Sequence, residues 1–214
     1  MNTIVTWLVA LMLWASPPER DAKHQAFPGW AETPAERTVR YESIATDIYE
    51  AVYVPGARLP WGGKNGPARS AALLLALSFG ESGWAPDVDK GPCYPGVHGR
   101  CDGGRAACIF QIQAGPGTTL SQHGISGKTG ADLFSDRKLC VQVALHMINR
   151  SFRAARLLPL EDRLNVYASG RVGAGRAGGS ARMALAEKFF KHSLPPAAPA
   201  WPGDEPETGK IAGN

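Results

Sequence analysis

The sequence predicts a mainly helical fold, and three observations support this prediction. Several segments carry apolar residues three and four positions apart, the spacing that places them on one face of an α-helix. Residues that favour helix starts precede these segments, and Gly or Pro follows them. No segment shows convincing alternation of apolar and polar residues, the pattern of a half-buried strand. A chain of 214 residues can form one domain of ordinary size with flanking segments.

The chain begins with an apolar run, Ile4 to Ala15, which is short for a transmembrane helix and matches the core of a signal peptide. No Lys or Arg precedes the run, and Pro17 and Pro18 stand where cleavage would be expected. We expect residues 1–20 to be a signal peptide or a short hydrophobic anchor. A short membrane-associated or virion-packed segment is the alternative.

After a linker, Thr33-Pro34-Ala35-Glu36 has the capping-box pattern with proline at the first helical position. Apolar residues then continue at helical spacing to Val52, and Pro55-Gly56 follows. A first helix of the folded domain is therefore predicted to begin at this capping box and to end before Pro55.

The next predicted helix, Pro67 to Gly80, is apolar on nearly every face, so we expect it to be central and buried. Gly80, Gly83 and Pro86 are expected to stop it close to Glu81. The negative end of the helix dipole and apolar surroundings both favour a protonated glutamic acid there. A glutamic acid held protonated near neutral pH is what a general acid requires. The ordinary alternative is a solvated glutamate at a helix end.

Three helices are expected in the second half of the chain, with bounds Ser135 to Phe152, Leu160 to Tyr167 and Ser180 to Lys191. Ser135 and Ser180 would cap the first and the last of them. Gly173 to Gly178 matches a dinucleotide-binding pattern, but no strand precedes it, so a flexible loop is predicted. Residues 193–214 are rich in Pro, Ala and Gly and are predicted to be a disordered tail.

The net charge of +4 is mildly basic, and the 23 Lys and Arg residues are spread along the chain. This spread argues against a nucleic-acid-binding stripe. A mildly basic protein suits an anionic partner such as a cell wall or a membrane surface.

All the cysteines lie in or next to the middle loop, and they are Cys93, Cys101, Cys108 and Cys140. An even number in one region predicts two disulfides in an oxidising compartment. We favour Cys93–Cys101, which would close the loop, and Cys108–Cys140, which would attach it to the next helix. Zinc bound with His98 and His123 is an alternative, but the tight C-x2-C spacing of structural zinc sites is missing, so no metal is predicted. Four free thiols in a cytosolic protein are the remaining possibility.

Three short segments occur in a specific order: Glu81-Ser82-Gly83-Trp84, Ile109-Phe110-Gln111-Ile112 and Tyr167-Ala168-Ser169-Gly170. Together they resemble the lysozyme-like lytic transglycosylases of the soluble type. That family has a helix ending in Glu-Ser, then a Gly-Leu-Met-Gln-Ile segment, then an Ala-Tyr-Asn-Ala-Gly motif. The resemblance covers about residues 68–172. It implies a lysozyme-like helical catalytic domain over residues 34–192, with the long cysteine-containing loop beside the active-site cleft.

The resemblance also implies an activity, which is cleavage of the β-1,4 bond between N-acetylmuramic acid and N-acetylglucosamine in peptidoglycan. Glu81 would be the general acid and then the base, which gives a 1,6-anhydro product without a second carboxylate. Ser82 would orient Glu81 or the substrate, and Tyr167 would hydrogen-bond Glu81. Gln111 and the backbone near Ile109 would line the cleft, and Phe110 is a further candidate for substrate binding or positioning. No cofactor is implied; the partner is the glycan strand, and the protein would be a monomer of the periplasm, the cell envelope or the medium, or part of a phage virion.

The chain departs from the family pattern at two motif positions, because Cys108 stands in place of Gly and Ala168 in place of Asn. The middle loop is also longer than usual and contains Asp87, Asp89 and Asp102. If one of these carboxylates positioned a water, the protein would be a hydrolytic lysozyme; an ordinary turn aspartate is the alternative for each. A non-catalytic peptidoglycan-binding or assembly protein with the same fold is the competing class.

Overall fold

A computed structural model describes residues 2–16, 31–90, 105–115, 117–164, 166–167, 178–193 and 195–196. These residues form a mainly helical structure, as predicted. The elements are α1 (Thr3–Ala15), α2 (Pro34–Val52), α3 (Gly66–Ser82), α4 (Pro86–Lys90), β1 (Ala106–Ala107), β2 (Ile112–Gln113), α6 (Thr119–Gln122), α7 (Gly130–Ser135), α8 (Arg137–Ala154), the 3-10 helix η2 (Leu160–Asp162) and α10 (Gly178–His192).

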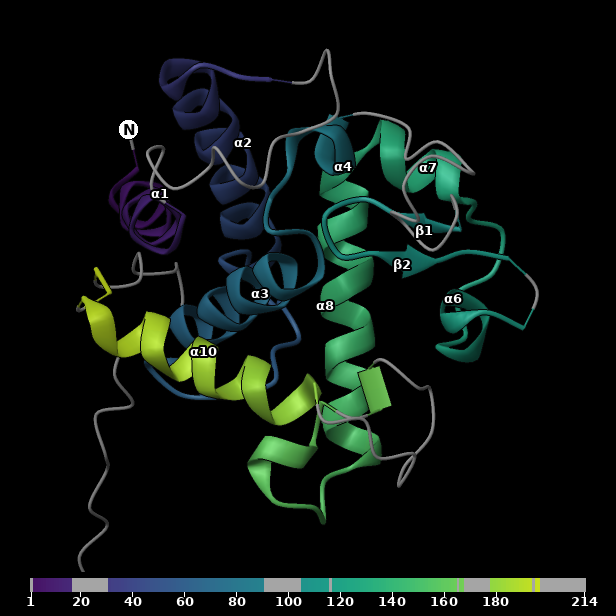
Figure 1. The fold of residues 1–214 in the computed structure, drawn as a ribbon. Coiled ribbons are helices and arrows are strands. Elements are labelled where there is room, and N and C mark those ends of the chain that lie inside the picture. The colour runs from purple at the N-terminus through teal and green to yellow at the C-terminus, as the bar shows by residue number, and fades with distance from the viewer. Residues whose placement is uncertain are drawn as a thin grey trace, which may run out of the picture.

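The long helix α8 runs beside two groups of elements (Figure 1). Helices α1, α2, α3 and α10 lie on one side of it, and the β1–β2 hairpin with α6 and α7 lies on the other (Figure 1). Helix α10 packs along α3, and α2 packs against α1, α3 and α8. Because α3 touches α1, α2, α8 and α10, it is the central element of the larger group.

Helix α3 is buried along most of its length, and this confirms the prediction of a central helix. Its leucines from Leu73 to Leu77 have no solvent exposure. Removing such a side chain from water contributes roughly 1.5–3 kcal/mol each. The helix runs past Gly80 to Ser82, so Glu81 lies within its last turn.

Helix α1 contributes apolar side chains to the same core. Leu8, Leu11 and Met12 are fully buried, and the indole Nε1 of Trp7 donates a hydrogen bond of 2.9 Å to Ser193 Oγ. Whether residues 1–20 act as a signal peptide or as a hydrophobic anchor stays a prediction. In the part of the chain that the structure describes, no helix has both the length and the apolar character to cross a membrane.

Helix starts follow the sequence signals in one case and depart from them in two. The capping box between Thr33 and Glu36 is present at the start of α2. Ser135, however, ends α7, and the carboxylate of Asp136 caps α8 by accepting a hydrogen bond from Leu139 N at 2.9 Å. Ser180 lies inside α10, which begins at Gly178.

The segment predicted as one helix from Leu160 to Tyr167 is instead the short 3-10 helix η2, with helical backbone again at residues 166–167. A two-residue strand pair, which the sequence did not predict, closes the end of the long middle loop. Ala107 pairs with Ile112 and Ala106 with Gln113 in antiparallel register.

The predicted disulfide between Cys108 and Cys140 is confirmed, with 6.6 Å between the two Cα atoms. It joins the hairpin to α8, as expected. The predicted partners Cys93 and Cys101 lie outside the described residues, and so do Asp102, the segment 168–170, the loop 173–177 and nearly all of the tail.

Candidate active site at the end of helix α3

Glu81 is the penultimate residue of α3, and the backbone after it turns sharply. Gly83 has φ +59°, and its N–H donates to Phe79 O at 2.8 Å, which closes the helix with a left-handed cap. Trp84 follows with φ +54°, a conformation that side chains other than glycine rarely adopt. Two successive left-handed residues therefore end the helix directly after Glu81 and Ser82.

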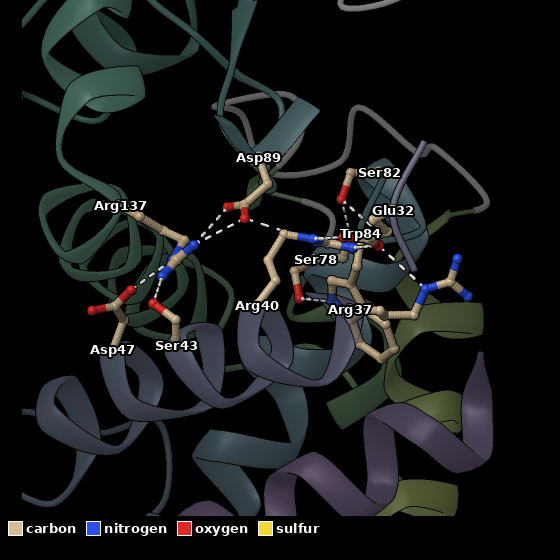
Figure 2. Close-up of polar contacts among 10 residues, drawn as sticks. All are labelled: Glu32, Arg37, Arg40, Ser43, Asp47, Ser78, Ser82, Trp84, Asp89 and Arg137. Atoms are coloured by element: carbon tan, nitrogen blue, oxygen red, sulfur yellow. Dashed lines mark hydrogen bonds and ion pairs between the residues drawn. The ribbon is translucent and has the colours of Figure 1, made fainter. Parts of the chain in front are cut away.

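The side chain of Trp84 holds this turn against the core. Its Nε1 donates to Ser78 Oγ at 2.8 Å (Figure 2). Its ring packs near Tyr41 and Phe79, at 5.5 and 4.8 Å between ring centroids. Ser82 Oγ donates to Ser78 O and accepts from Trp84 N (Figure 2). The hydroxyl of Ser82, predicted to orient Glu81 or the substrate, thus takes part in the helix-ending turn.

Glu81 forms an ion pair across the interface between α3 and α10. Nη2 of Arg182 lies 2.5 Å from Glu81 Oε1, and the exposed fractions of the two side chains are 24% and 21%. Arg182 is 101 positions away from Glu81, and no pattern in the sequence pointed to it. Only the packing of α10 on α3 brings the two charges together.

Tyr167 is the second predicted site residue that lies near Glu81. Burial raises the pKa of the Tyr167 phenol; the negative charge of Glu81 raises it further, and the positive charge of Arg182 acts in the opposite direction. The Tyr167 hydroxyl is buried and has no hydrogen-bond partner among the described residues. Nε2 of the buried His123 lies 3.3 Å from the Tyr167 carbonyl oxygen.

The hairpin turn carries the middle motif and has an unusual backbone. Cys108 has φ +56° and Gln111 has φ +49°, and both the backbone N–H and the side-chain amide of Gln111 donate to Cys108 O. The family pattern has Gly at the position of Cys108, and positive φ is the conformation that glycine favours. Cys108 therefore keeps a glycine-like backbone while its sulfur bonds to Cys140.

The other residues of this motif lie in two environments. The side chains of Ile109 and Phe110 belong to the hydrophobic core, with exposed fractions of 0% and 1%. Gln111 is half-buried. Of these three residues, Gln111 is therefore the one whose side chain reaches the surface.

Two of the predicted second carboxylates, Asp87 and Asp89, are buried in α4. Both oxygens of Asp89 accept from Arg137 Nη1, at 2.9 and 3.1 Å, and Arg40 Nη1 lies 3.8 Å from Asp89 Oδ2 (Figure 2). Asp89 is thus part of an ion-pair network with two arginines. Asp102 lies outside the described residues.

The ion-pair network extends to both sides of Asp89. Arg137 also donates to Asp47, at 2.6 Å, and to Ser43 (Figure 2). On the other side, Arg40 forms a bidentate pair with Glu32 (Figure 2). Burial alone would raise the pKa of Glu32, but hydrogen bonds and positive charge from Arg40 outweigh it and leave that pKa below its usual value. These charge pairs connect α4 to α2 and α8.

Comparisons with protein-family models, with curated proteins and with solved structures found no match to this chain. Within the described residues, no group of three or more His, Cys, Asp or Glu side chains is placed to hold a metal ion. Fold and site define a mainly helical protein with a disulfide-anchored hairpin and a Glu–Arg–Tyr cluster between α3 and α10.

Proposed function

We propose that this protein is a lytic transglycosylase with a lysozyme-like fold that cleaves the β-1,4 bond between N-acetylmuramic acid and N-acetylglucosamine in peptidoglycan. The observation that carries the proposal is the cluster at the end of α3. A glutamate in the last turn of a buried helix interacts with the tyrosine of a second, distant motif of the family resemblance. The partner is then the glycan strand of peptidoglycan. The protein would act in the cell envelope, outside the cell or as part of a phage virion.

The proposed reaction uses one carboxyl group twice. Protonated Glu81 gives its proton to the glycosidic oxygen as the bond to C1 of the muramoyl residue breaks, with the electron pair remaining on that oxygen. The acetamido group of the muramoyl residue stabilises the cationic centre. The Glu81 carboxylate then takes the proton of the 6-hydroxyl as O6 bonds to C1, which forms the 1,6-anhydro sugar and restores the protonated acid. The Tyr167 hydroxyl would position Glu81 during these transfers.

Hydrolysis would require a second carboxylate that positions a water. The ion pair of Asp89 with Arg137 disfavours Asp89 for this role, because its oxygens already accept from a guanidinium. A lysozyme-type hydrolase would then depend on Asp87 or Asp102.

The proposal is tested by digestion of purified peptidoglycan with the full chain, followed by mass spectrometry of the products. Muropeptides with 1,6-anhydro ends are expected. Glu81→Gln should reduce activity by at least about a hundredfold, the low end for losing a general acid. Glu50→Gln is the matched control, because Glu50 pairs with Lys138 on the surface and should leave activity unchanged.

Products with reducing ends would show that the protein is a hydrolase and not a transglycosylase. Full activity of folded Glu81→Gln would overturn the role of Glu81. No products from folded wild-type protein would favour the non-catalytic peptidoglycan-binding class.

A further inference from the structure

The contact between Arg182 and Glu81 is at odds with the first step of the proposed reaction. A guanidinium within hydrogen-bond distance of a carboxyl group favours its ionised form. The first step requires the opposite form, a protonated carboxylic acid. Both side chains are mostly shielded from solvent, so water screens this attraction less than it would on the surface.

We propose that Arg182 is a positioning residue that holds Glu81 as an ion-paired carboxylate in the free protein, and that the bound glycan separates the pair so that Glu81 takes up its proton. This inference rests on the proposed function and adds a step to it. The acid would become competent only in the complex, and the ion pair would keep Glu81 in one place until the substrate arrives.

The surface of α3 is shaped to accept the Arg182 side chain. A Cβ atom added at Gly80 would lie 3.2 Å from Arg182 Nε and 3.5 Å from Arg182 Cγ. The arginine therefore lies across the last turn of α3, over a position without a side chain. Glycine in a helix interior is less favourable than alanine, so Gly80 provides this space at the expense of helix stability.

The guanidinium is also incompletely bonded in this position. The Nε–H of Arg182 is buried and has no acceptor among the residues described. A buried donor without an acceptor is unfavourable, and this lowers the net stability of the ion pair. A substrate can therefore displace this ion pair more easily than one in which every donor of the guanidinium has an acceptor.

Among the described residues, Arg182 from α10 and the Tyr167 phenol interact with Glu81. The phenol is neutral in the pH range of the experiment because its pKa lies above its ordinary value. The positive charge of Arg182 is therefore the influence on Glu81 that a substitution can remove.

The first test is the pH dependence of cleavage of soluble glycan strands by wild type and Arg182→Gln. Activity falls at high pH as the acid loses its proton, and this basic limb reports free protein in kcat/KM and the complex in kcat. In Arg182→Gln the limb of kcat/KM should move up by about one pH unit, whereas the limb of kcat should stay in place. Arg182→Lys should retain most of the wild-type profile, and Arg153→Gln, at an exposed position of α8, is the control.

The second test is Gly80→Ala, which leaves both charged groups intact. The added methyl group would lie 3.2 Å from Arg182 Nε, so the Arg182 side chain should shift by a few tenths of an ångström over the helix and away from its present contact with Glu81. We expect the kcat/KM limb to move in the same direction as in Arg182→Gln, with an unfolding temperature equal to or above that of wild type. A variant that changes the pH profile without loss of stability cannot be explained by a merely structural role of Arg182.

A measurement that does not need activity separates this inference from the proposed function. The carboxyl carbon of Glu81 is titrated by NMR in wild type and in Arg182→Gln, with Glu81→Gln as the assignment control. A Glu81 titration unchanged by loss of Arg182 would overturn the inference, as would equal shifts of the kcat and kcat/KM limbs. If the Glu81 titration shifts in Arg182→Gln but the wild-type protein is inactive on glycan, the ion pair between Arg182 and Glu81 is supported and only the proposed function is refuted.

Discussion

Two tyrosine hydroxyls, those of Tyr53 and Tyr167, are buried without a hydrogen-bond partner in the described part of the chain. An unpaired buried hydroxyl costs about 1–3 kcal/mol, so each of them lowers stability. Their surroundings differ. Tyr53 follows the end of α2 and stacks on Tyr49, whereas Tyr167 interacts with Glu81. The Tyr167 hydroxyl is therefore the one that lies near the charge of the proposed general acid.

Replacement of Tyr167 by Phe tests this difference. The variant should be as stable as wild type or more stable by up to about 1 kcal/mol, because it loses an unpaired buried hydroxyl. Turnover of glycan should fall, because the hydroxyl that we propose to position Glu81 during the proton transfers is lost. Urea unfolding and initial rates measure the two effects. Tyr53→Phe removes the other unpaired hydroxyl and should change only stability; an unfolded Tyr167→Phe would instead make Tyr167 a core residue.

At the scale of elements, Asp89 ties the short helix α4 to α2 and α8. Its side chain is fully buried, and its partners come from both longer helices, Arg40 from α2 and Arg137 from α8. A helix of five residues has little stability of its own, so these ion pairs fix its position. Helix α4 follows the turn at Trp84, and the network thereby supports the backbone that ends α3 behind Glu81.

Replacement of Asp89 by Asn separates this structural role from that of a second catalytic carboxylate. Breaking one member of a buried ion pair leaves the remaining charges uncompensated and typically costs about 3–5 kcal/mol. We expect a loss of this size in the free energy of unfolding, with activity per folded molecule retained. Glu50→Gln, which breaks an exposed pair, should leave the unfolding midpoint in place. Normal stability with lost activity would assign Asp89 to catalysis.

At the scale of the whole molecule, the sequence predicted the features that depend on local patterns. The capping box at Thr33, the buried helix leading to Glu81 and the bond between Cys108 and Cys140 could all be predicted from it. The predicted helix starts at Ser135 and Ser180 were wrong. A serine caps a helix only where the backbone before it is not yet helical, and the sequence pattern does not show where that is. Asp136, which follows Ser135, caps α8 instead with its own carboxylate.

Contacts between distant segments could not be predicted in this way. Arg182 reaches Glu81 only because α10 packs on α3, and no periodicity fixes which face of α10 meets that helix end. The hairpin was missed because two-residue strands show no alternation. The left-handed backbone at Cys108 could not be predicted either, because a residue other than glycine gives no sign of positive φ. The family that the sequence resembles has Gly at this position.

His123 links the stability of the whole molecule to pH. Burial lowers the pKa of its imidazole; the hydrogen bond to the Tyr167 carbonyl opposes this shift, and the positive charge of Arg150 adds to it. Nε2 must carry the proton that it shares with this carbonyl, so Nδ1 is the atom that a second proton would occupy. Nδ1 is buried without a partner in the described structure, and a charged imidazole there would carry an unsatisfied N–H.

The folded protein should therefore lose stability as the pH falls below about 6.5, the ordinary pKa of histidine in an unfolded chain. In this range the unfolded chain binds a proton that the folded protein resists, so protonation favours unfolding, and the loss continues down to the lowered pKa of the folded state. Unfolding temperatures between pH 7.5 and 5 should fall in wild type and fall less in His123→Gln, whose amide can still donate to Tyr167 O. His192→Gln, at an exposed position of α10, should follow wild type. Equal slopes in all three proteins would show that His123 binds a proton equally well in the folded and the unfolded state, which would contradict a lowered pKa in the fold.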